Sequence, residues 1–537
     1  MHALPVPGRR LDDRGRPERE DRPARLYRRR RALPAGRTGP ARSGAGGHAD
    51  RGLRGRRAGG GPVRGRGGRP TRLLLASAAV LLAAGPAFAD AGPVAWLQTY
   101  LAFDTSNPPG DERAAVEYLV SLIERHDPGG EIDVRVLTSP NGRANLYARL
   151  PANARDAGSG ALVLLHHVDV VPPGEGWSRP PFGGTLHDGK IWGRGALDAK
   201  SLGIAHLGAM FHVLESGQPR RRDLVFVASA DEEAGGADGV GWLLEEHREL
   251  FDDAEAVLNE AGVNRVAGDR LLWWGIETAQ KQVLWLRVTA TGRGGHGSGF
   301  NPASPTHRLV RALNRVLELE HPWRVTTAAH EAYRRLAAFH SDEFAEVFDQ
   351  PIEAVQDELD RRLRVGGLDR VLLPGMSASF RDTVQITRID NGGGPVNVAP
   401  AEAVALIDAR LLSDTDAEAF RRRVDTVLGT GIHVEELLRS GASPASSTDS
   451  DVYRTLERVL GVRAPVAPAM IAGATDSRFF RRRGVDAYGF SPFVVASGDA
   501  AGIHGLDERI PVDGFLRGCE MMERVVAALV RGNGGQP

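Results

Sequence analysis

The sequence predicts an α/β fold: an open, mostly parallel sheet with helices on both faces, and an inserted α+β domain. Short apolar runs typical of buried parallel strands alternate with segments of helical spacing between residues 113 and 262. This strand–helix–strand order predicts parallel strands joined by crossover helices. Near residue 281 the pattern changes to the half-exposed alternation of an antiparallel sheet.

The elements of the first part are expected in a simple order. The stretch RAAVEYLVSLIERH (113–126) has helical spacing, and SLGIAHLGAMFHVLES (201–216) predicts a crossover helix. Buried strands are predicted from three apolar runs, which are ALVLLHHVD (161–169), DLVFVASADEE (223–233) and AEAVLNEAG (254–262). We assign residues 90–280 to the first part of a catalytic domain.

The inserted domain is predicted at 281–443. KQVLWLRVTATG (281–292) alternates as a strand, and AVALIDARLL (403–412) returns to strand after charged helical stretches at 330–365. PTHRLVRALNRVLEL (305–319) is amphipathic, with five residues expected on its buried face: Leu309, Val310, Leu313, Val316 and Leu317. A polar, turn-rich segment at 440–451 then leads into the second part of the catalytic domain, 444–537.

The N-terminal residues differ in composition from the rest. Residues 1–68 are rich in Arg, Gly and Pro and have too few apolar residues to offset their ordering entropy, so we favour a disordered leader or an untranslated upstream extension. A basic nucleic-acid-binding tail is the alternative. Residues 69–89 combine basic residues, a short apolar core and Ala87-Phe88-Ala89, as in a secretory signal peptide. An uncleaved N-terminal anchor remains the alternative.

The signal segment predicts a periplasmic or secreted protein with no stable membrane association after cleavage. Residues 90–537 carry 47 basic and 62 acidic residues, a formal charge of −15, so no nucleic acid is expected as a partner of this part. The one cysteine, Cys519, cannot form an internal disulfide. The fold must therefore depend on its core, and a metal site must use His, Asp and Glu.

Acidic and imidazole side chains follow three of the predicted strands, at the edge where ligands bind in open α/β sheets. These residues are His167, Asp169, Glu232, Glu233 and Glu260. Asp198 precedes the crossover helix, and His504 lies in a glycine-flanked loop near the C-terminus. Singly, a histidine is more often structural, and an Asp before a helix is more often an N-cap.

Together, these side chains supply two imidazoles and several carboxylates without a thiolate. That set suits zinc, or two divalent metals bridged by one carboxylate. A nearby cation also explains how the acidic run Asp231-Glu232-Glu233 is tolerated at the end of a buried strand, because it stabilises ionised carboxylates.

Six motifs then occur in order across residues 90–534: HHVDVVPPGEGWSRPPFGG, GKIWGRGALDAK, SADEEAGG, GRGGHGS, NVAP followed by DAR, and IHGLDERI. With these motifs the chain resembles the di-zinc aminoacylase/carboxypeptidase metallopeptidase family, which contains glutamate carboxypeptidase and succinyl-diaminopimelate desuccinylase. The resemblance implies two Zn²⁺ ions, with Co²⁺ or Mn²⁺ as alternatives. Asp198 resembles the carboxylate that bridges both metals. His167 and Glu260 would complete one site, and Glu233 and His504 the other.

The resemblance also implies catalytic roles. Glu232 resembles the general base that takes a proton from the metal-bridging water, and Asp169 the aspartate that orients the first histidine ligand. His296 matches a histidine that reaches the active site of the partner subunit and stabilises the oxyanion. The inserted domain (281–443) resembles the lid of the family, which implies a homodimer formed through this lid. Asn397 and Arg410 match substrate-contacting positions. Arg410 suits a substrate carboxylate, with a salt bridge inside the lid as the alternative.

Three positions depart from the family pattern: His166 replaces a usual glycine, NEAG (259–262) replaces the commoner Glu-Gly-Gly, and the helical stretch 330–365 is long. The long stretch resembles the branch with Gly-Xaa carboxypeptidases and secreted N-acyl-amino-acid hydrolases. The expected function is hydrolysis of an amide or peptide bond in N-acyl amino acids or short peptides that carry a free carboxylate. A non-catalytic binding or assembly relative of the same fold is the alternative.

Overall fold

A computed structural model describes residues 92–155, 158, 160–268, 270–372 and 375–531. The predicted leader (1–68) and signal segment (69–89) lie outside the described residues, so both stay predictions. Among the described helices, none has the length and apolar character needed to span a membrane.

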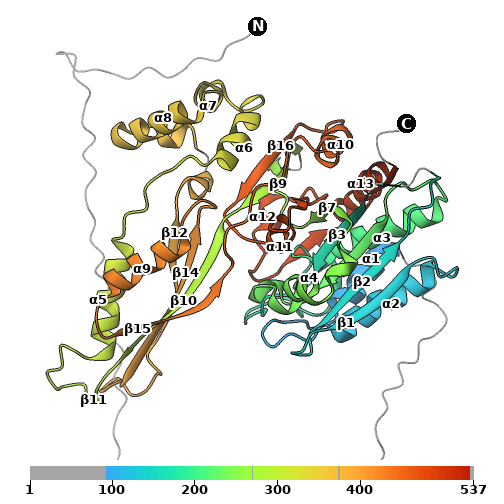
Figure 1. The fold of residues 1–537 in the computed structure, drawn as a ribbon. Helices are drawn as coiled ribbons and strands as arrows, with labels where there is room; N and C mark the ends of the chain where they lie inside the picture. The colour runs from blue at the N-terminus through green and yellow to red at the C-terminus, as the bar shows by residue number, and fades with distance from the viewer. Residues whose placement is uncertain (1–91, 156–157, 159, 269, 373–374, 532–537) are drawn as a thin grey trace, which may run out of the picture. The chain divides into compact units, whose positions relative to one another are not determined.

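The main sheet has nine strands and confirms the predicted fold class (Figure 1). Its order is β1-β2-β6-β3-β7-β17-β9-β16, with β8 paired to β9. The pairs β6–β3, β3–β7, β7–β17 and β9–β16 are parallel. The strands are β1 (Asp133–Thr138), β2 (Ala144–Leu150), β3 (Ala161–His167), β6 (Leu224–Ser229), β7 (Ala254–Asn259), β8 (Arg265–Ala267), β9 (Arg270–Gln280), β16 (Val466–Ile471) and β17 (Asp486–Gly489).

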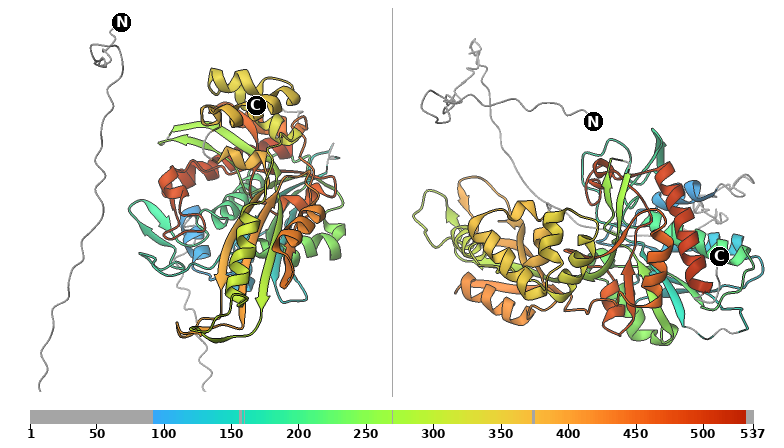
Figure 2. Two further views of the ribbon diagram at one scale, coloured as in Figure 1. Left: turned by 90° about the vertical axis from the view of Figure 1, so that its left-hand side faces the viewer. Right: turned by 90° about the horizontal axis from the view of Figure 1, so that it is seen from above.

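Helices cover both faces of this sheet, because β3 and β6 are buried along their whole length and need partners on each side. One face packs against α1 (Gly92–Leu101), α2 (Arg113–His126), α3 (Lys200–Glu215), α10 (Asp451–Leu460) and α13 (Val512–Arg531). The other packs against α4 (Trp242–Glu246) and α11 (Ser477–Arg481). Helices α3 and α13 pack against each other and are labelled close together in Figure 1. Figure 2 shows the fold from two further sides.

A second, antiparallel sheet has the order β12-β14-β10-β15. Strand β10 (Gln282–Thr291) begins directly after β9, and its alternating burial agrees with the half-exposed strand predicted there. The other strands are β12 (Thr383–Asp390), β14 (Glu402–Leu411) and β15 (Ile432–Arg439). Helices α5 (Pro305–Leu317) and α9 (Ala417–Leu428) bury one face of this sheet, which is the antiparallel, one-sided architecture expected of the inserted segment.

The buried face of α5 is narrower than predicted. Leu309, Leu313 and Val316 are buried, whereas Val310 is 54% and Leu317 61% exposed. The prediction for Val310 and Leu317 is therefore wrong. Ala312 is fully buried in the same core cluster, so the buried stripe of α5 includes Ala312 in place of Val310 and Leu317.

The long helical stretch forms α6 (Thr327–Ala337), α7 (Asp342–Phe348) and α8 (Ile352–Val365). These helices share a core of their own, which includes Phe344, Phe348 and Phe380 and extends to Ala467 and Met470 of β16. The stretch thus packs against the edge of the nine-stranded sheet. Short elements complete the fold: β4 (Thr185–His187), β5 (Lys190–Trp192), β11 (Gly295–His296), β13 (Val398–Ala399), α12 (Ser497–Ala500) and β18 (Arg509–Pro511).

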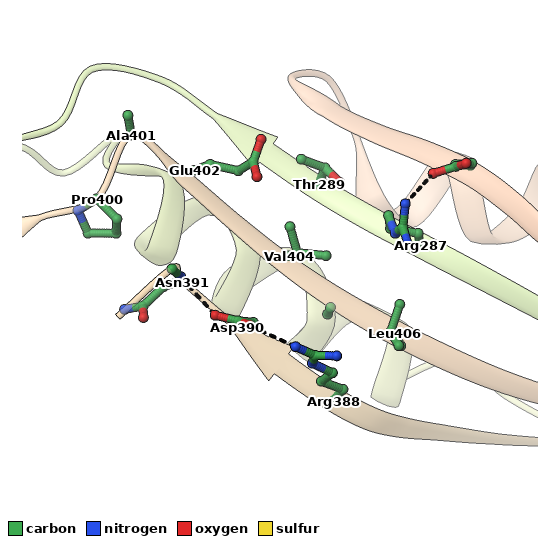
Figure 3. Close-up of a pocket in the computed structure, with 13 residues that line it drawn as sticks. Arg287, Thr289, Arg388, Asp390, Asn391, Pro400, Ala401, Glu402, Val404 and Leu406 are labelled. Atoms are coloured by element: carbon green, nitrogen blue, oxygen red, sulfur yellow. Dashed lines mark hydrogen bonds and ion pairs between the residues drawn. The ribbon is translucent and has the colours of Figure 1, made fainter. Parts of the chain in front are cut away.

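The open face of the four-stranded sheet carries a hollow of about 720 Å³ (Figure 3). Four of its charged side chains form two ion pairs: Arg388 with Asp390 at 3.0 Å, and Arg287 with Glu435 at 3.2 Å. None of the predicted site residues lines it. Several of the predicted site residues lie instead at the carboxyl ends of the parallel strands β3, β6 and β7.

Candidate active site

The three predicted strand ends meet in the structure. Strands β6, β3 and β7 are adjacent and parallel, so their carboxyl ends deliver side chains to one edge of the sheet. His167 ends β3, and Glu260 directly follows β7. Glu232 and Glu233 form the 3₁₀ turn Glu232–Ala234 after β6.

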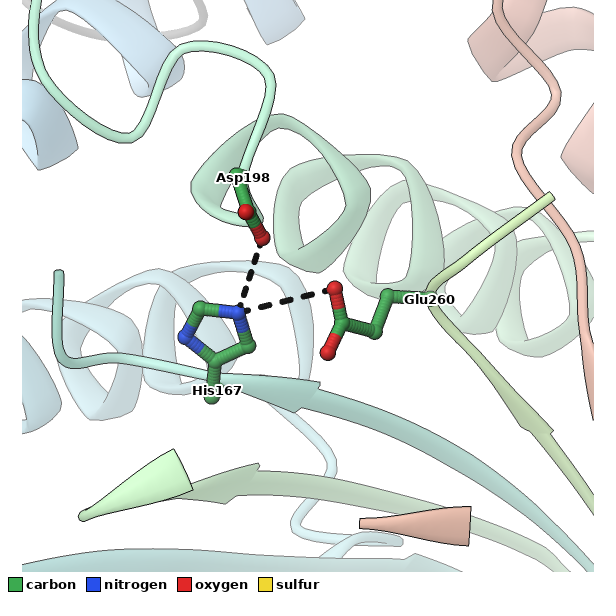
Figure 4. A group of neighbouring side chains, drawn as sticks. All are labelled: His167, Asp198 and Glu260. Carbon is green, nitrogen blue, oxygen red and sulfur yellow. Dashed lines mark hydrogen bonds and ion pairs between the residues drawn. The ribbon is translucent and has the colours of Figure 1, made fainter. Parts of the chain in front are cut away.

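Three of these side chains form a first group (Figure 4). The Nε2 atom of His167 lies 3.1 Å from Oδ1 of Asp198 and 3.7 Å from Oε2 of Glu260. His167 is buried and the two carboxylates are half-buried. Its Nδ1–H donates a hydrogen bond to the backbone carbonyl of Asp169 at 2.8 Å, which leaves Nε2 free to bind a cation.

A second group contains Asp198 again, with Glu233 and His504. Oδ2 of Asp198 lies 3.0 Å from Nε2 of His504, which is also 3.4 Å from Oε1 of Glu233. The ligand atoms within each group lie within 4.8 Å of one another. One oxygen of Asp198 therefore faces each histidine, which is the arrangement of a carboxylate shared by two sites.

The donor set of both groups fits divalent cations. Each group has one imidazole nitrogen and carboxylate oxygens, which suit zinc and similar metals. Oε1 of Glu233 is buried and, apart from its 3.4 Å ion pair with Nε2 of His504, has no hydrogen-bond partner among the described residues. Such an atom is costly to desolvate without a partner, and a cation at the second group satisfies it.

Charge repulsion within the site has the expected effect on pKa. Burial and the neighbouring Glu260 raise the pKa of Glu232 well above its usual range. Burial and Asp198 raise the pKa of Glu260 to about 7. The neighbouring carboxylates of Asp198 and Glu233 raise the pKa of His504 to about 10. Burial and neighbouring carboxylates both contribute to the shifts of Glu232 and Glu260, and a bound cation stabilises the ionised form of such carboxylates.

The acidic run after β6 is also stabilised by the protein itself. Asp231 adopts a left-handed conformation (φ 68°), which turns the chain back after the strand. Its carboxylate accepts hydrogen bonds from Arg143 at 3.0 Å and Asn107 at 3.2 Å. Gly236 follows at φ 69°, where a Cβ atom would lie 2.4 Å from the carboxylate of Asp476. The first acidic residue of the run is thus paired within the protein, and the two glutamates face the site.

Asp169 positions the site by a different contact from the one expected. Its carboxylate is 3.7 Å from Nδ1 of His167, and the backbone carbonyl makes the hydrogen bond instead. The two carboxylate oxygens accept hydrogen bonds from the backbone N–H groups of Glu232 and Glu233, both at 3.1 Å. Asp169 therefore holds the first histidine through its backbone and the glutamate turn through its side chain.

Sequence reasoning missed Glu508. Its fully buried carboxylate accepts hydrogen bonds from the backbone N–H groups of Leu197 at 2.7 Å and Asp198 at 3.1 Å. It also accepts from Arg194 at 2.7 Å and from the Gly195 N–H at 3.0 Å. Glu508 thus fixes the loop that carries the shared carboxylate. The motifs WGRG and IHGLDER contained both partners, but nothing in the sequence indicated that they meet.

A cavity of about 410 Å³ opens on this site. Glu232, Glu233, His504 and Arg410 line it together with Asp198 and Glu260. Arg410 is bound to Asp408 of its own strand, with Nε 2.7 Å from Oδ1 and Nη2 3.1 Å from Oδ2. Arg410 therefore lines the site, as expected of a substrate-binding residue. It also forms the salt bridge within the antiparallel sheet that was the alternative prediction.

His296 and Asn397 lie elsewhere, and neither lines this cavity. His296 pairs with Val398 at the β11–β13 ladder, and the Gly297 N–H donates to the Asn397 carbonyl. Arg410 is opposite Val283, and Thr291 lies eight positions after Val283 along β10, about 26 Å at the usual rise of a strand. Because the β11–β13 ladder continues beyond Thr291, His296 is remote from the site of its own chain.

Comparison with known proteins agrees with this geometry. A family model described as peptidase family M20/M25/M40 matches residues 163–528. The chain belongs to peptidase family M20/M25/M40. Relatives of this M20 chain include aminoacylase-1 from Sus scrofa, 27% identical over 460 residues, covering 81% of this chain and 95% of the relative. Another is an N-fatty-acyl-amino acid synthase/hydrolase from Xenopus tropicalis, 29% identical, covering 65% of this chain and 68% of the relative.

Solved structures show the same fold. Human carnosine dipeptidase 1 matches with a TM-score of 0.59 at 16% identity, covering 82% of this chain and 97% of that chain. A metallo-carboxypeptidase of Sulfolobus solfataricus matches with a TM-score of 0.58 at 19% identity, covering 81% and 98%. The M20 chain is a metallo-hydrolase that acts on amide or peptide bonds. The site keeps all five predicted ligands and Glu232, which disfavours the non-catalytic alternative.

Proposed function

We propose that this M20 hydrolase uses two zinc ions to cleave the amide bond of N-acyl amino acids or short peptides that carry a free carboxylate. The observation that carries the proposal is the shared carboxylate: Oδ1 of Asp198 faces His167 and Oδ2 faces His504. In this assignment His167 and Glu260 hold one ion, and Glu233 and His504 hold the other. Co²⁺ and Mn²⁺ also suit these ligands.

When bound, such ions supply Lewis-acid polarisation of the substrate carbonyl and a water of lowered pKa. Glu232 is the general base of the proposal. It lines the cavity beside the ligands, and the Asp169 carboxylate holds its backbone N–H at 3.1 Å. The Glu232 carboxylate takes a proton from the attacking water and then passes it to the leaving amine nitrogen.

The substrate carboxylate is assigned to the two arginines that line the cavity. Arg410 and Arg478 both line it. Arg478 donates to the backbone carbonyls of Gly235 at 2.7 Å and Thr475 at 2.6 Å, so its guanidinium is held rigidly at the wall. A fixed guanidinium suits a carboxylate better than a mobile ammonium does.

The remaining roles extend beyond one chain. We propose a homodimer, formed through the antiparallel sheet domain, in which His296 donates a hydrogen bond to the oxyanion in the partner's site and Asn397 contacts substrate there. The distance of His296 from its own site supports this arrangement. We also propose that the protein is periplasmic or secreted and that it does not stay bound to a membrane after its signal segment is cleaved.

The direct test is a hydrolysis panel on the zinc-loaded protein, with the chelated protein as a control. N-acyl amino acids and dipeptides are expected to be cleaved, and the matching C-terminal carboxamides are expected to react at least tenfold more slowly. Equal rates for acids and carboxamides would remove the role of Arg410 and Arg478. Full activity after zinc removal would refute the metal-dependent mechanism.

A further inference from the structure

A second cavity, of about 310 Å³, adjoins the candidate metal site from another direction. Asp198 and Glu260 line both cavities, and the other lining residues differ between the two. The second cavity lies among the start of α3, the hairpin before β9 and the segment that carries α12. Its apolar lining residues are Leu197, Leu202, Val266, Phe493, Val495 and Ile503.

The two cavities differ in charge. The first contains two arginines, whereas the described residues that line the second include no cation, and their only ionisable groups are the shared Asp198 and Glu260. The amide of Asn264 is already engaged, because its Nδ2 donates to the carbonyls of Ser491 at 2.8 Å and Phe493 at 3.1 Å. A carboxylate is unfavourable in such surroundings, and an aliphatic group is favourable.

We propose that the second cavity binds the acyl chain of the substrate, and that this enzyme selects N-acyl amino acids with medium-length aliphatic acyl groups. The inference rests on the proposed amide hydrolysis. With the scissile amide beside Asp198 and Glu260, the amino-acid carboxylate lies toward Arg410 and the acyl chain enters the apolar cavity. Asp198 and Glu260, which line both cavities, thus lie between the binding places of the polar and apolar parts of the substrate.

The volume limits the length of the chain. A cavity of about 150 Å³ holds the six carbons of benzene in another protein, so one of about 310 Å³ holds roughly ten to twelve carbons. Each buried methylene strengthens binding by about fourfold. We expect affinity to rise with acyl length and then to level off near ten carbons.

The first experiment measures kcat/KM of the zinc-loaded protein for N-acylglycines from acetyl to tetradecanoyl. A steep rise that ends near decanoyl supports the proposal, and a flat or falling series overturns it. If no acylglycine is cleaved, the proposed function fails, and calorimetric binding then tests the cavity separately. Octanoate is expected to bind at least 100-fold more tightly than acetate, and equal affinities would refute the acyl cavity.

Two variants near the β8–β9 hairpin test which cavity binds the acyl chain of the substrate. Val266→Trp fills the second cavity and is expected to lower kcat/KM for octanoylglycine at least tenfold, with less than a threefold change for acetylglycine. Val263→Trp is the matched control, because Val263 does not line the second cavity but lines a neighbouring one of about 360 Å³, which also contains Trp273 and Tyr333. If Val263→Trp removes the long-chain preference and Val266→Trp does not, the acyl chain occupies that other cavity and the proposal is wrong.

A second variant that fills the cavity, Val495→Phe, tests the same proposal if Val266→Trp does not fold. Val495 is half-buried and lines the same cavity from a different segment of the chain, just before α12. Both filling variants are expected to keep the thermal midpoint within a few degrees and to weaken octanoate binding at least tenfold. Unchanged octanoate binding in a folded filling variant would overturn the assignment.

Discussion

Replacing Glu508 by Gln tests whether a residue that binds no metal controls the shared ligand. The Glu508 carboxylate accepts four hydrogen bonds of 2.7 to 3.1 Å, three from backbone N–H groups of the loop before α3 and one from Arg194. Glutamine has nearly the same shape, but its amide group offers a single oxygen and presents N–H donors to the donors of the loop.

The expected effect follows from these contacts. Hydrogen bonds to a charged group contribute about 1.5–3 kcal/mol each, and two of the four are lost. The substitution also leaves the Arg194 guanidinium, whose side chain is 2% exposed, without its counter-ion. Breaking a buried ion pair on one side costs about 3–5 kcal/mol. We therefore expect the free energy of unfolding to fall by about 3–5 kcal/mol.

Metal binding should weaken as well. Two of the hydrogen bonds hold the backbone of Leu197 and Asp198, so loss of Glu508 releases the shared carboxylate from its position. Such supporting contacts typically contribute 10- to 100-fold to metal affinity. Competition with a chelator measures the affinity of Glu508→Gln, and urea denaturation measures its stability.

A surface variant provides the comparison. Glu435→Gln breaks an exposed ion pair with Arg287 at 3.2 Å and should cost at most about 1 kcal/mol without changing zinc affinity. If Glu508→Gln binds zinc as tightly as the unmodified protein and unfolds at the same urea concentration, the positioning argument is refuted.

Three further predictions concern catalysis, the partner subunit and pH. Glu232→Gln should keep both metals by elemental analysis and lose about 10²- to 10⁴-fold in kcat, so near-normal turnover would exclude it as the base. His296→Ala should lose activity at full metal content, and mixed dimers with Asp198→Asn should regain part of it; absence of complementation would argue for a site built from one chain. Burial lowers the pKa of His206 to about 3 in the folded protein, whereas its unfolded value is near 6.5. Below pH 6.5 the unfolded chain therefore binds a proton that the folded protein does not, and the free energy of unfolding decreases as the pH falls. Between pH 7.5 and 5 this loss is about 2 kcal/mol, and His206→Leu should unfold with a correspondingly weaker pH dependence.

The strand ends were predictable because each depends on local pattern. Buried runs ending at His167, Ser229 and Asn259 read directly as parallel strands, and the order β6-β3-β7 then brings their ends together. His504 was identified by its motif alone. Its approach to Asp198 joins positions 306 residues apart, which no periodicity encodes.

Other features depended on packing that the sequence does not reveal. The contact of Glu508 with the loop of Asp198 arises because β18 (Arg509–Pro511) pairs with β5, more than 300 residues away. The salt bridge of Arg410 with Asp408 results from both side chains lying on the same face of β14. The acyl cavity likewise has walls from three distant segments.

By itself the sequence determined the fold class, the family and the residue types of the metal site, since these follow from short-range periodicity and contiguous motifs. Only the tertiary structure decided which oxygen of Asp198 faces which imidazole, what holds that carboxylate, and how the polar and apolar cavities divide at the site. The physical reason is that distances and burial between remote segments arise from the summed packing of the whole core, which no local stretch of sequence specifies.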